Sequence, residues 1–143
     1  MFVTLFLGVL NLNTGLLRFC NAGHEDPLLI GKGVGLLPTN NNIPLGVMPK
    51  WKYESQEARI YPKTTIFLYT DGLTEAENKN RAQFGKLRMT RIARQALLKA
   101  QNMDDTCDPK TIIALETKAL HLFVGNAEKS DDLTMMAIQL GAK

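Results

Sequence analysis

Acidic side chains stand where two apolar runs of the sequence end and begin. Asp71 follows the run "IFLYT", and the pair Asp131-Asp132 precedes "LTMMAIQL". If these runs are neighbouring antiparallel strands, the end of one lies beside the start of the other, so the acidic segments meet at one edge of a sheet. Carboxylates brought together repel unless a cation lies between them, and Mg²⁺ or Mn²⁺ prefers carboxylate and water oxygens. The pattern indicates a candidate site for a hard divalent cation.

A second interpretation of the same residues needs no metal. Asp-Gly is a strong turn signal, so Asp71-Gly72 is also typical of a hairpin turn. Ser130-Asp131 is then the loop that leaves a helix. The spacing alone favours this interpretation over the metal site.

Few other residues have the chemistry of a catalytic group. The chain has two histidines, His24 and His121, and no GxSxG segment, which argues against a Ser-His-Asp triad. We expect His24, in "NAGHEDP", to close a turn with its ring hydrogen-bonded, and His121 to be structural. Cys20 and Cys107 form no CxxC pair, which argues against a zinc site or a disulfide framework and fits a reducing cytoplasm.

Length and composition describe an ordinary globular domain. The 143 residues are 45% hydrophobic and 22% charged, with a formal net charge of +3. No concentrated basic patch interleaves with aromatic residues, so nucleic acid is not an expected partner. The opening segment lacks the positive region and cleavage site of a signal peptide, and its apolar run is too short to span a membrane.

Strands are expected to position the acidic residues. The opening run "FVTLFLGVLNL" is apolar on both faces, which predicts a central strand covered on both sides. Asn13-Thr14-Gly15 predicts a tight hairpin into the strand "LLRFCN". We also expect a short strand ending at Ile30, a Gly-rich turn over 31–35, an edge strand over 53–59, a buried strand over 64–70, and "LTMMAIQL" as the last strand.

Two helices follow the buried strand. Apolar residues at helical spacing predict a helix over 86–101, with a solvated basic face formed by Arg88, Arg91, Arg94 and Lys99. Asp108 as N-cap, Pro109 at the first helical position and Gly125 after the end predict a second helix reaching Val124. Strands, two helices and a final strand predict an α+β domain with helices stacked on a sheet.

Six segments in this order resemble the SpoIIE/RsbU-type branch of the metal-dependent PPM protein serine/threonine phosphatases. They are "MFVTLFLGVLNLNTG", "NAGHEDPLLI", "IPLGVMP", "IFLYTDGLTEAEN", "FGKLR" and "SDDLTMMAIQL". The resemblance implies a β-sandwich flanked by helices, in α/β/β/α layers. It also implies two Mn²⁺ or Mg²⁺ ions whose activated water attacks a phosphoserine or phosphothreonine, with no protein nucleophile. Asp71 and Asp131 match the family's metal-binding aspartates, and Gly72, Asp132, His24 and Asn21 take supporting positions.

The resemblance is to the C-terminal portion of such a domain. Family members carry, upstream of the "MFVTL" strand, an acidic segment that supplies the aspartate bridging both metals. We therefore expect residues 1–143 to form a partial phosphatase domain without its first strands. It would have two ligands for one metal and doubtful activity on its own.

The resemblance also implies partners. In the family, the substrate is a phosphorylated regulatory protein of the anti-anti-sigma type. The alternative is a catalytically inactive, phosphatase-like module that binds a partner protein. A sheet without its first strands offers an open edge, so a homodimer formed by edge pairing is possible in either case.

Overall fold

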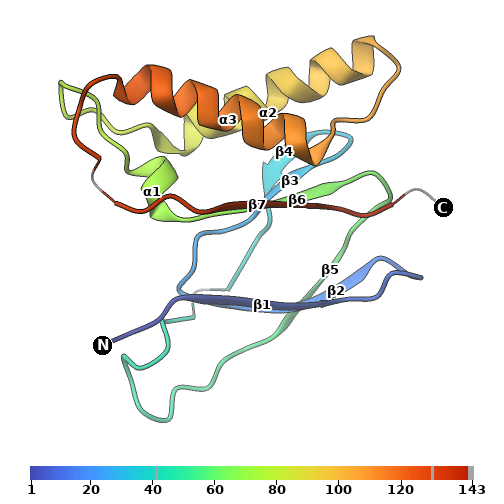
Figure 1. The fold of residues 1–143 in the computed structure, drawn as a ribbon. Helices are drawn as coiled ribbons and strands as arrows, with labels where there is room; N and C mark the ends of the chain where they lie inside the picture. Colours follow the sequence, from blue (N-terminus) through green and yellow to red (C-terminus); the bar gives the residue numbers. More distant parts are fainter. Residues whose placement is uncertain (41, 130, 142–143) are drawn as a thin grey trace.

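Two antiparallel sheets lie face to face, and two long helices cover the outer face of one of them (Figure 1). The computed structural model describes residues 1–40, 42–129 and 131–141, so Ser130 of the expected helix-exit loop lies outside the described residues. The smaller sheet has the order β1-β2-β5 and the larger sheet the order β4-β3-β6-β7. The strands are β1 (Leu5–Leu10), β2 (Leu16–Ala22), β3 (Leu28–Ile30), β4 (Val34–Leu36), β5 (Gln56–Arg59), β6 (Thr65–Tyr69) and β7 (Met135–Gln139). The helices are α1 (Asp71–Thr74), α2 (Gly85–Asn102) and α3 (Pro109–Val124).

The main core lies between the larger sheet and its helices. Side chains on the helix-facing side of the sheet, such as Leu28 and Phe67, are fully buried there. They meet a buried stripe of α2 that includes Met89 and Ala93. A smaller cluster of buried apolar side chains, which includes Leu17, fills the space between the two sheets. The α+β prediction is confirmed, and the described residues build three of the four expected layers.

The helix expected over 86–101 is α2 (Gly85–Asn102), which has no side-chain cap at its start, whereas α3 begins and ends where local signals place it. The Asp108 carboxylate accepts a hydrogen bond from the Lys110 backbone N–H at 2.8 Å, and Pro109 occupies the first turn. Gly125 follows the last turn with a φ of 59°, a value that disfavours most other residues. Arg88 is exposed, as expected of the solvated face, and its guanidinium also lies 4.2 Å from the centroid of the Phe123 ring.

The prediction of a central first strand is wrong. β1 pairs with β2 alone and forms the edge of the smaller sheet. Leu7 and Val9 are 61% and 71% exposed, because no helix of the described residues covers the outer face of this sheet. The apolar composition of β1 therefore does not reflect burial on both sides here.

Turn signals gave mixed results. The hairpin between β1 and β2 is confirmed, and Gly15 there has a φ of +74°. Asp71-Gly72 is not a hairpin turn: it begins the short helix α1. The expected turn over 31–35 is shorter, because Gly35 lies inside β4. The edge strand expected over 53–59 forms only from Gln56 onward, paired with β2.

Candidate metal centre at the β6–β7 edge

The antiparallel pairing of β6 and β7 brings the two acidic segments together. The register pairs Tyr69 with Met135, and the Thr70 N–H extends the ladder by donating to the Thr134 carbonyl at 3.1 Å. Beyond these residues the chain enters α1 on one side and comes from the loop after α3 on the other. Figure 1 shows α1 and this loop at the same end of the sandwich.

Gly72 explains how closely the two segments approach. A Cβ atom at this position would lie 2.2 Å from the Asp132 carbonyl oxygen, closer than real Cβ contacts occur. Gly72 is therefore required for close packing against the backbone of Asp132 and Leu133. It is needed for its small size and not for an unusual backbone conformation, since it lies in a helix. This contact explains why a glycine follows Asp71 in the "TDG" segment, which a hairpin turn does not explain here.

The acidic side chains differ in what they already contact. Asp71 is exposed at the first position of α1, and its carbonyl accepts from the Glu75 N–H. One Asp131 carboxylate oxygen accepts from the Asp132 N–H at 2.7 Å, which fixes the local turn. The Asp132 carboxylate is fully exposed and lies 3.8 Å from the Lys129 ammonium, a surface pair of little energetic weight.

The candidate ligands are of the type that a hard cation prefers, but they are too few to complete its coordination. Asp71 and Asp131 offer carboxylate oxygens, the ligands that Mg²⁺ and Mn²⁺ prefer. Within the described ranges no group of three or more His, Cys, Asp or Glu side chains could hold a metal ion. Since Mg²⁺ takes six ligands, any ion here must draw the rest from water or another segment.

Asn21, rather than His24, closes the turn of the "NAGHED" segment. The Asn21 side chain is buried, donates to the His24 carbonyl and accepts from the His24 N–H, each at 2.9 Å. It also donates to Asp26 at 3.2 Å. The His24 ring is hydrogen-bonded as expected, with Nδ1 3.3 Å from the Thr4 hydroxyl oxygen.

Tyr69 links this loop to the end of β6. Its hydroxyl donates to the Asp26 carbonyl at 2.9 Å, and its ring is almost fully buried. Desolvation, followed by the charges of Glu25 and Asp26, raises the pKa of the Tyr69 phenol. Tyr69 is therefore a neutral hydrogen-bond donor at physiological pH and positions the loop that carries His24.

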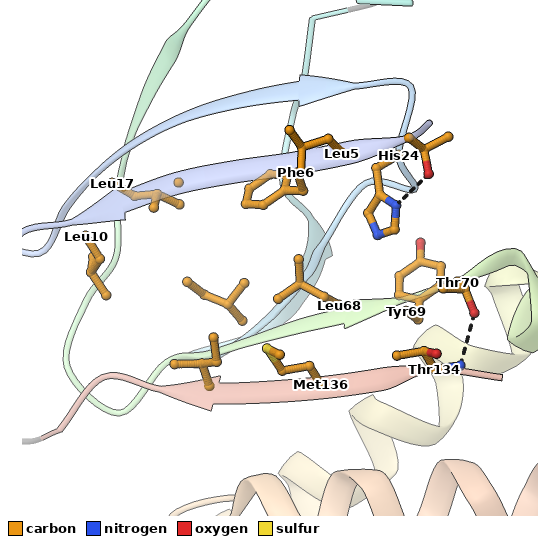
Figure 2. Close-up of a pocket in the computed structure, with 14 residues that line it drawn as sticks. Leu5, Phe6, Leu10, Leu17, His24, Leu68, Tyr69, Thr70, Thr134 and Met136 are labelled. Carbon is orange, nitrogen blue, oxygen red and sulfur yellow. Dashed lines mark hydrogen bonds between the residues drawn. The ribbon is translucent and has the colours of Figure 1, made fainter. Parts of the chain in front are cut away.

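A cleft of about 510 Å³ opens between the two sheets at this edge of the sandwich. Its walls are mostly apolar side chains of β1, β6 and β7, including Phe6, Leu68 and Met136. Figure 2 shows that its polar groups gather at one end, where His24 lies on one side and Thr70 and Thr134 on the other. The polar end of the cleft thus reaches Thr70, the residue before Asp71.

The sequence interpretation missed the threonines of this edge. Thr70 and Thr134 precede Asp71 and follow the Asp131-Asp132 pair, and the register places them opposite each other. Treating the two motifs as paired antiparallel strands would have placed these residues together, because the last residue of one strand then lies opposite the first residue of the other. The structure brings Asp71, Gly72, Asp131 and Asp132 into one locality. It places His24 across the cleft, on the turn that Asn21 closes.

Comparison with protein families gives one match over almost the whole chain. A family model described as "Stage II sporulation protein E (SpoIIE)" matches residues 1–141. Protein IcfG of Synechocystis is 27% identical over 139 residues. That alignment takes in 96% of this chain and 20% of IcfG.

Solved structures share the fold. The structure of the RsbU and RsbW domains of Rv1364c from Mycobacterium tuberculosis matches with a TM-score of 0.71 and 23% identity, over 95% of this chain and 35% of that one. The Mn-presoaked phosphatase domain of SpoIIE from Bacillus subtilis matches with a TM-score of 0.66 and 17% identity, over 98% of this chain and 57% of that one. The chain thus spans less than two-thirds of each of these three proteins.

Proposed function

This chain belongs to the SpoIIE family, and from that premise we propose that it carries part of the metal site of a metal-dependent protein serine/threonine phosphatase. The observation behind the proposal is the β6–β7 register, which continues into the close approach of Gly72, next to Asp71, to the backbone of Asp132. Family membership supports a phosphatase-like module. The reaction, the metal and the substrate are our inference.

In the proposed reaction Asp71 and Asp131 hold a Mn²⁺ or Mg²⁺ ion, and the complete domain holds two. A divalent ion bound there would lower the pKa of its water and neutralise charge on a phosphoryl group. The two aspartates would hold that ion beside Thr70 and Thr134, which line the polar end of the cleft. Asn21 and Tyr69 fix the loop that carries His24 on the opposite side.

The proposed substrate is phosphoserine on a regulatory protein of the anti-anti-sigma type, in the cytoplasm. The basic helix α2, which has five Lys or Arg residues and no acidic residue, supports an acidic or phosphorylated partner. No helix among the described residues is long and apolar enough to cross a membrane.

A second candidate function is a non-catalytic module that binds a partner protein. The incomplete donor set and the exposed edge of β1 favour it. Pairing of two copies through β1 would form a homodimer, since an exposed apolar edge strand is a template for β-pairing.

Substitution of Asp71 separates the two functions. The protein to test is the chain preceded by the N-terminal portion of a SpoIIE-family phosphatase domain, assayed on a phosphoserine protein at saturating Mn²⁺. We expect Asp71→Asn to lower kcat by roughly a thousandfold or more, because losing a metal-activated hydroxide removes several kcal/mol of transition-state stabilisation. The thermal midpoint should change little, because Asn keeps the volume and hydrogen-bonding shape of the side chain.

Glu75→Gln is the matched control, because it removes an exposed carboxylate at the other end of the same short helix. The Glu75→Gln protein should have the same kcat as the protein without a substitution. An Asp71→Asn protein with unaltered kcat would remove Asp71 from the site and favour the binding module.

A further inference from the structure

The side chain of Thr70 has unusual hydrogen-bond partners for a residue at the start of a helix. It is the N-cap of α1, with extended backbone angles, yet its side chain makes no capping hydrogen bond. A threonine at an N-cap normally accepts from the N–H groups of the first turn, which stabilises the helix by about 1 kcal/mol. The Thr70 hydroxyl is directed instead toward the other acidic segment.

The Thr70 hydroxyl bridges two backbone groups of that segment. It accepts from the Thr134 N–H at 3.1 Å and donates to the Asp132 carbonyl at 3.4 Å, the second being the weaker bond (Figure 2 shows the first). Together with the backbone bond from the Thr70 N–H to the Thr134 carbonyl, three hydrogen bonds join one residue to the 132–134 segment. We call this set the Thr70 strap.

Both candidate ligands are next in the chain to residues that the strap joins. Asp71 follows Thr70 in the chain, and Asp131 precedes the carbonyl that Thr70 binds. On the far side of Asp71, Gly72 packs against the same Asp132 carbonyl. Contacts on both sides of Asp71 therefore set its distance from the Asp131 turn, although Asp71 itself is exposed.

From this geometry we propose that Thr70 is a positioning residue for the metal site: its hydroxyl holds the Asp71 and Asp131 segments at the separation that one divalent cation requires. The inference rests on the proposed function, since it assigns Thr70 a role in the same site. Thr70 does not coordinate the ion. It acts through the backbone that carries the two ligands, so its loss should change metal affinity more than the fold.

Mn²⁺ titration of the 143-residue chain by calorimetry tests the strap. Thr70→Val keeps the shape and removes the hydroxyl, and we expect it to weaken Mn²⁺ binding about tenfold, the equivalent of one net hydrogen bond. Thr70→Ser restores the hydroxyl and should bind within about twofold of the unchanged chain. Asp71→Asn should abolish the binding.

These outcomes distinguish a failure of the proposed role of Thr70 from a failure of the proposed metal site. If Asp71→Asn lowers affinity while Thr70→Val binds like the unchanged chain, the strap is wrong and the metal site stands. If Mn²⁺ binding does not depend on Asp71, the proposed function is wrong, and the role of Thr70 falls with it.

Amide hydrogen exchange on the unchanged chain covers the case in which Thr70→Val does not fold. Because metal and strap stabilise the same arrangement, adding Mg²⁺, which is diamagnetic, should slow exchange of the Thr134 N–H, which the strap holds. An amide of the distant β1–β2 hairpin, such as the Leu16 N–H, should be unaffected. Equal exchange of the Thr134 N–H with and without bound Mg²⁺ would contradict the strap.

Discussion

The two sheets of this molecule are made of similarly apolar strands but have different surroundings. The larger sheet has helices α2 and α3 on one face and the smaller sheet on the other, so its β6 strand is buried along most of its length. The smaller sheet is covered on one face only, and its edge strand β1 is largely exposed. The candidate metal centre is built on the covered sheet, where the ends of β6 and β7 are fixed by a packed core.

This difference implies that the covered sheet carries most of the stability. Most side chains of its central strands β3 and β6 lose nearly all contact with water, and apolar burial is the largest favourable term in folding. The outer face of β1 contributes little of this burial and instead presents a continuous apolar surface. Substitutions of the same residue type in the two sheets should therefore have very different costs.

Leucine truncation in the covered sheet should give the largest effect. Leu28 in β3 is completely buried against the helices. We expect Leu28→Ala to lower the free energy of unfolding by roughly 2 to 5 kcal/mol, since it removes buried methyl groups and leaves a cavity. Chemical denaturation measures this loss. A cost below about 1 kcal/mol would mean that the helix-covered core is not well packed.

Glu116, buried on the helix side of the larger sheet, should make the stability of the fold depend on pH. It lies on α3, is fully buried, and neither carboxylate oxygen has a hydrogen-bond partner among the described residues. Desolvation raises the pKa of Glu116 from 4.5 to about 8. The folded chain therefore keeps a proton that the unfolded chain loses, and stability falls by roughly 1.4 kcal/mol per pH unit between these values.

The matched variant for this prediction is Glu116→Gln, which keeps the shape and cannot ionise. The thermal midpoint of the unchanged chain should fall between pH 5.5 and 8 relative to that of Glu116→Gln, and the difference should level off above the folded pKa. Parallel midpoints for the two proteins over this range would show that Glu116 is not held in its protonated form.

The smallest effect is expected on the bare sheet. Leu7→Ala in β1 repeats the Leu28 truncation at a side chain that is 61% exposed, and should change stability by less than about 1 kcal/mol. If two copies pair through β1, sedimentation should also show Leu7→Lys as a weaker dimer, because charge on an edge strand opposes pairing. A large loss of monomer stability in Leu7→Ala would mean that the outer face is covered in solution.

Local signals predicted the elements of the covered sheet well. The Asp108-Pro109 start and Gly125 end of α3 depend on backbone groups within a few residues, so the sequence shows them directly. The antiparallel pairing of β6 and β7 could also be predicted, because the two acidic motifs mark the strand ends.

The remaining features depend on residues far apart in the sequence. The apolar pattern of β1 is compatible with several surroundings, and only the tertiary arrangement reveals that one face is bare. Asp71-Gly72 has the composition of a turn, but Gly72 is needed for its contact with Asp132, which lies 60 positions away. The Thr70 strap also joins residues far apart in the sequence: pairing the two motifs would have set Thr70 opposite Thr134, but the hydrogen bonds of its hydroxyl depend on the tertiary structure.

The central claim is that the 70–72 and 131–133 segments share one divalent cation. NMR spectra of the ¹⁵N-labelled chain with small amounts of Mn²⁺ test it directly, because a bound paramagnetic ion broadens only the amide signals around it. We predict simultaneous broadening of the Asp71, Gly72, Asp132 and Leu133 signals, and its loss in Asp71→Asn. Broadening confined to one segment, or unchanged in Asp71→Asn, would contradict the shared site.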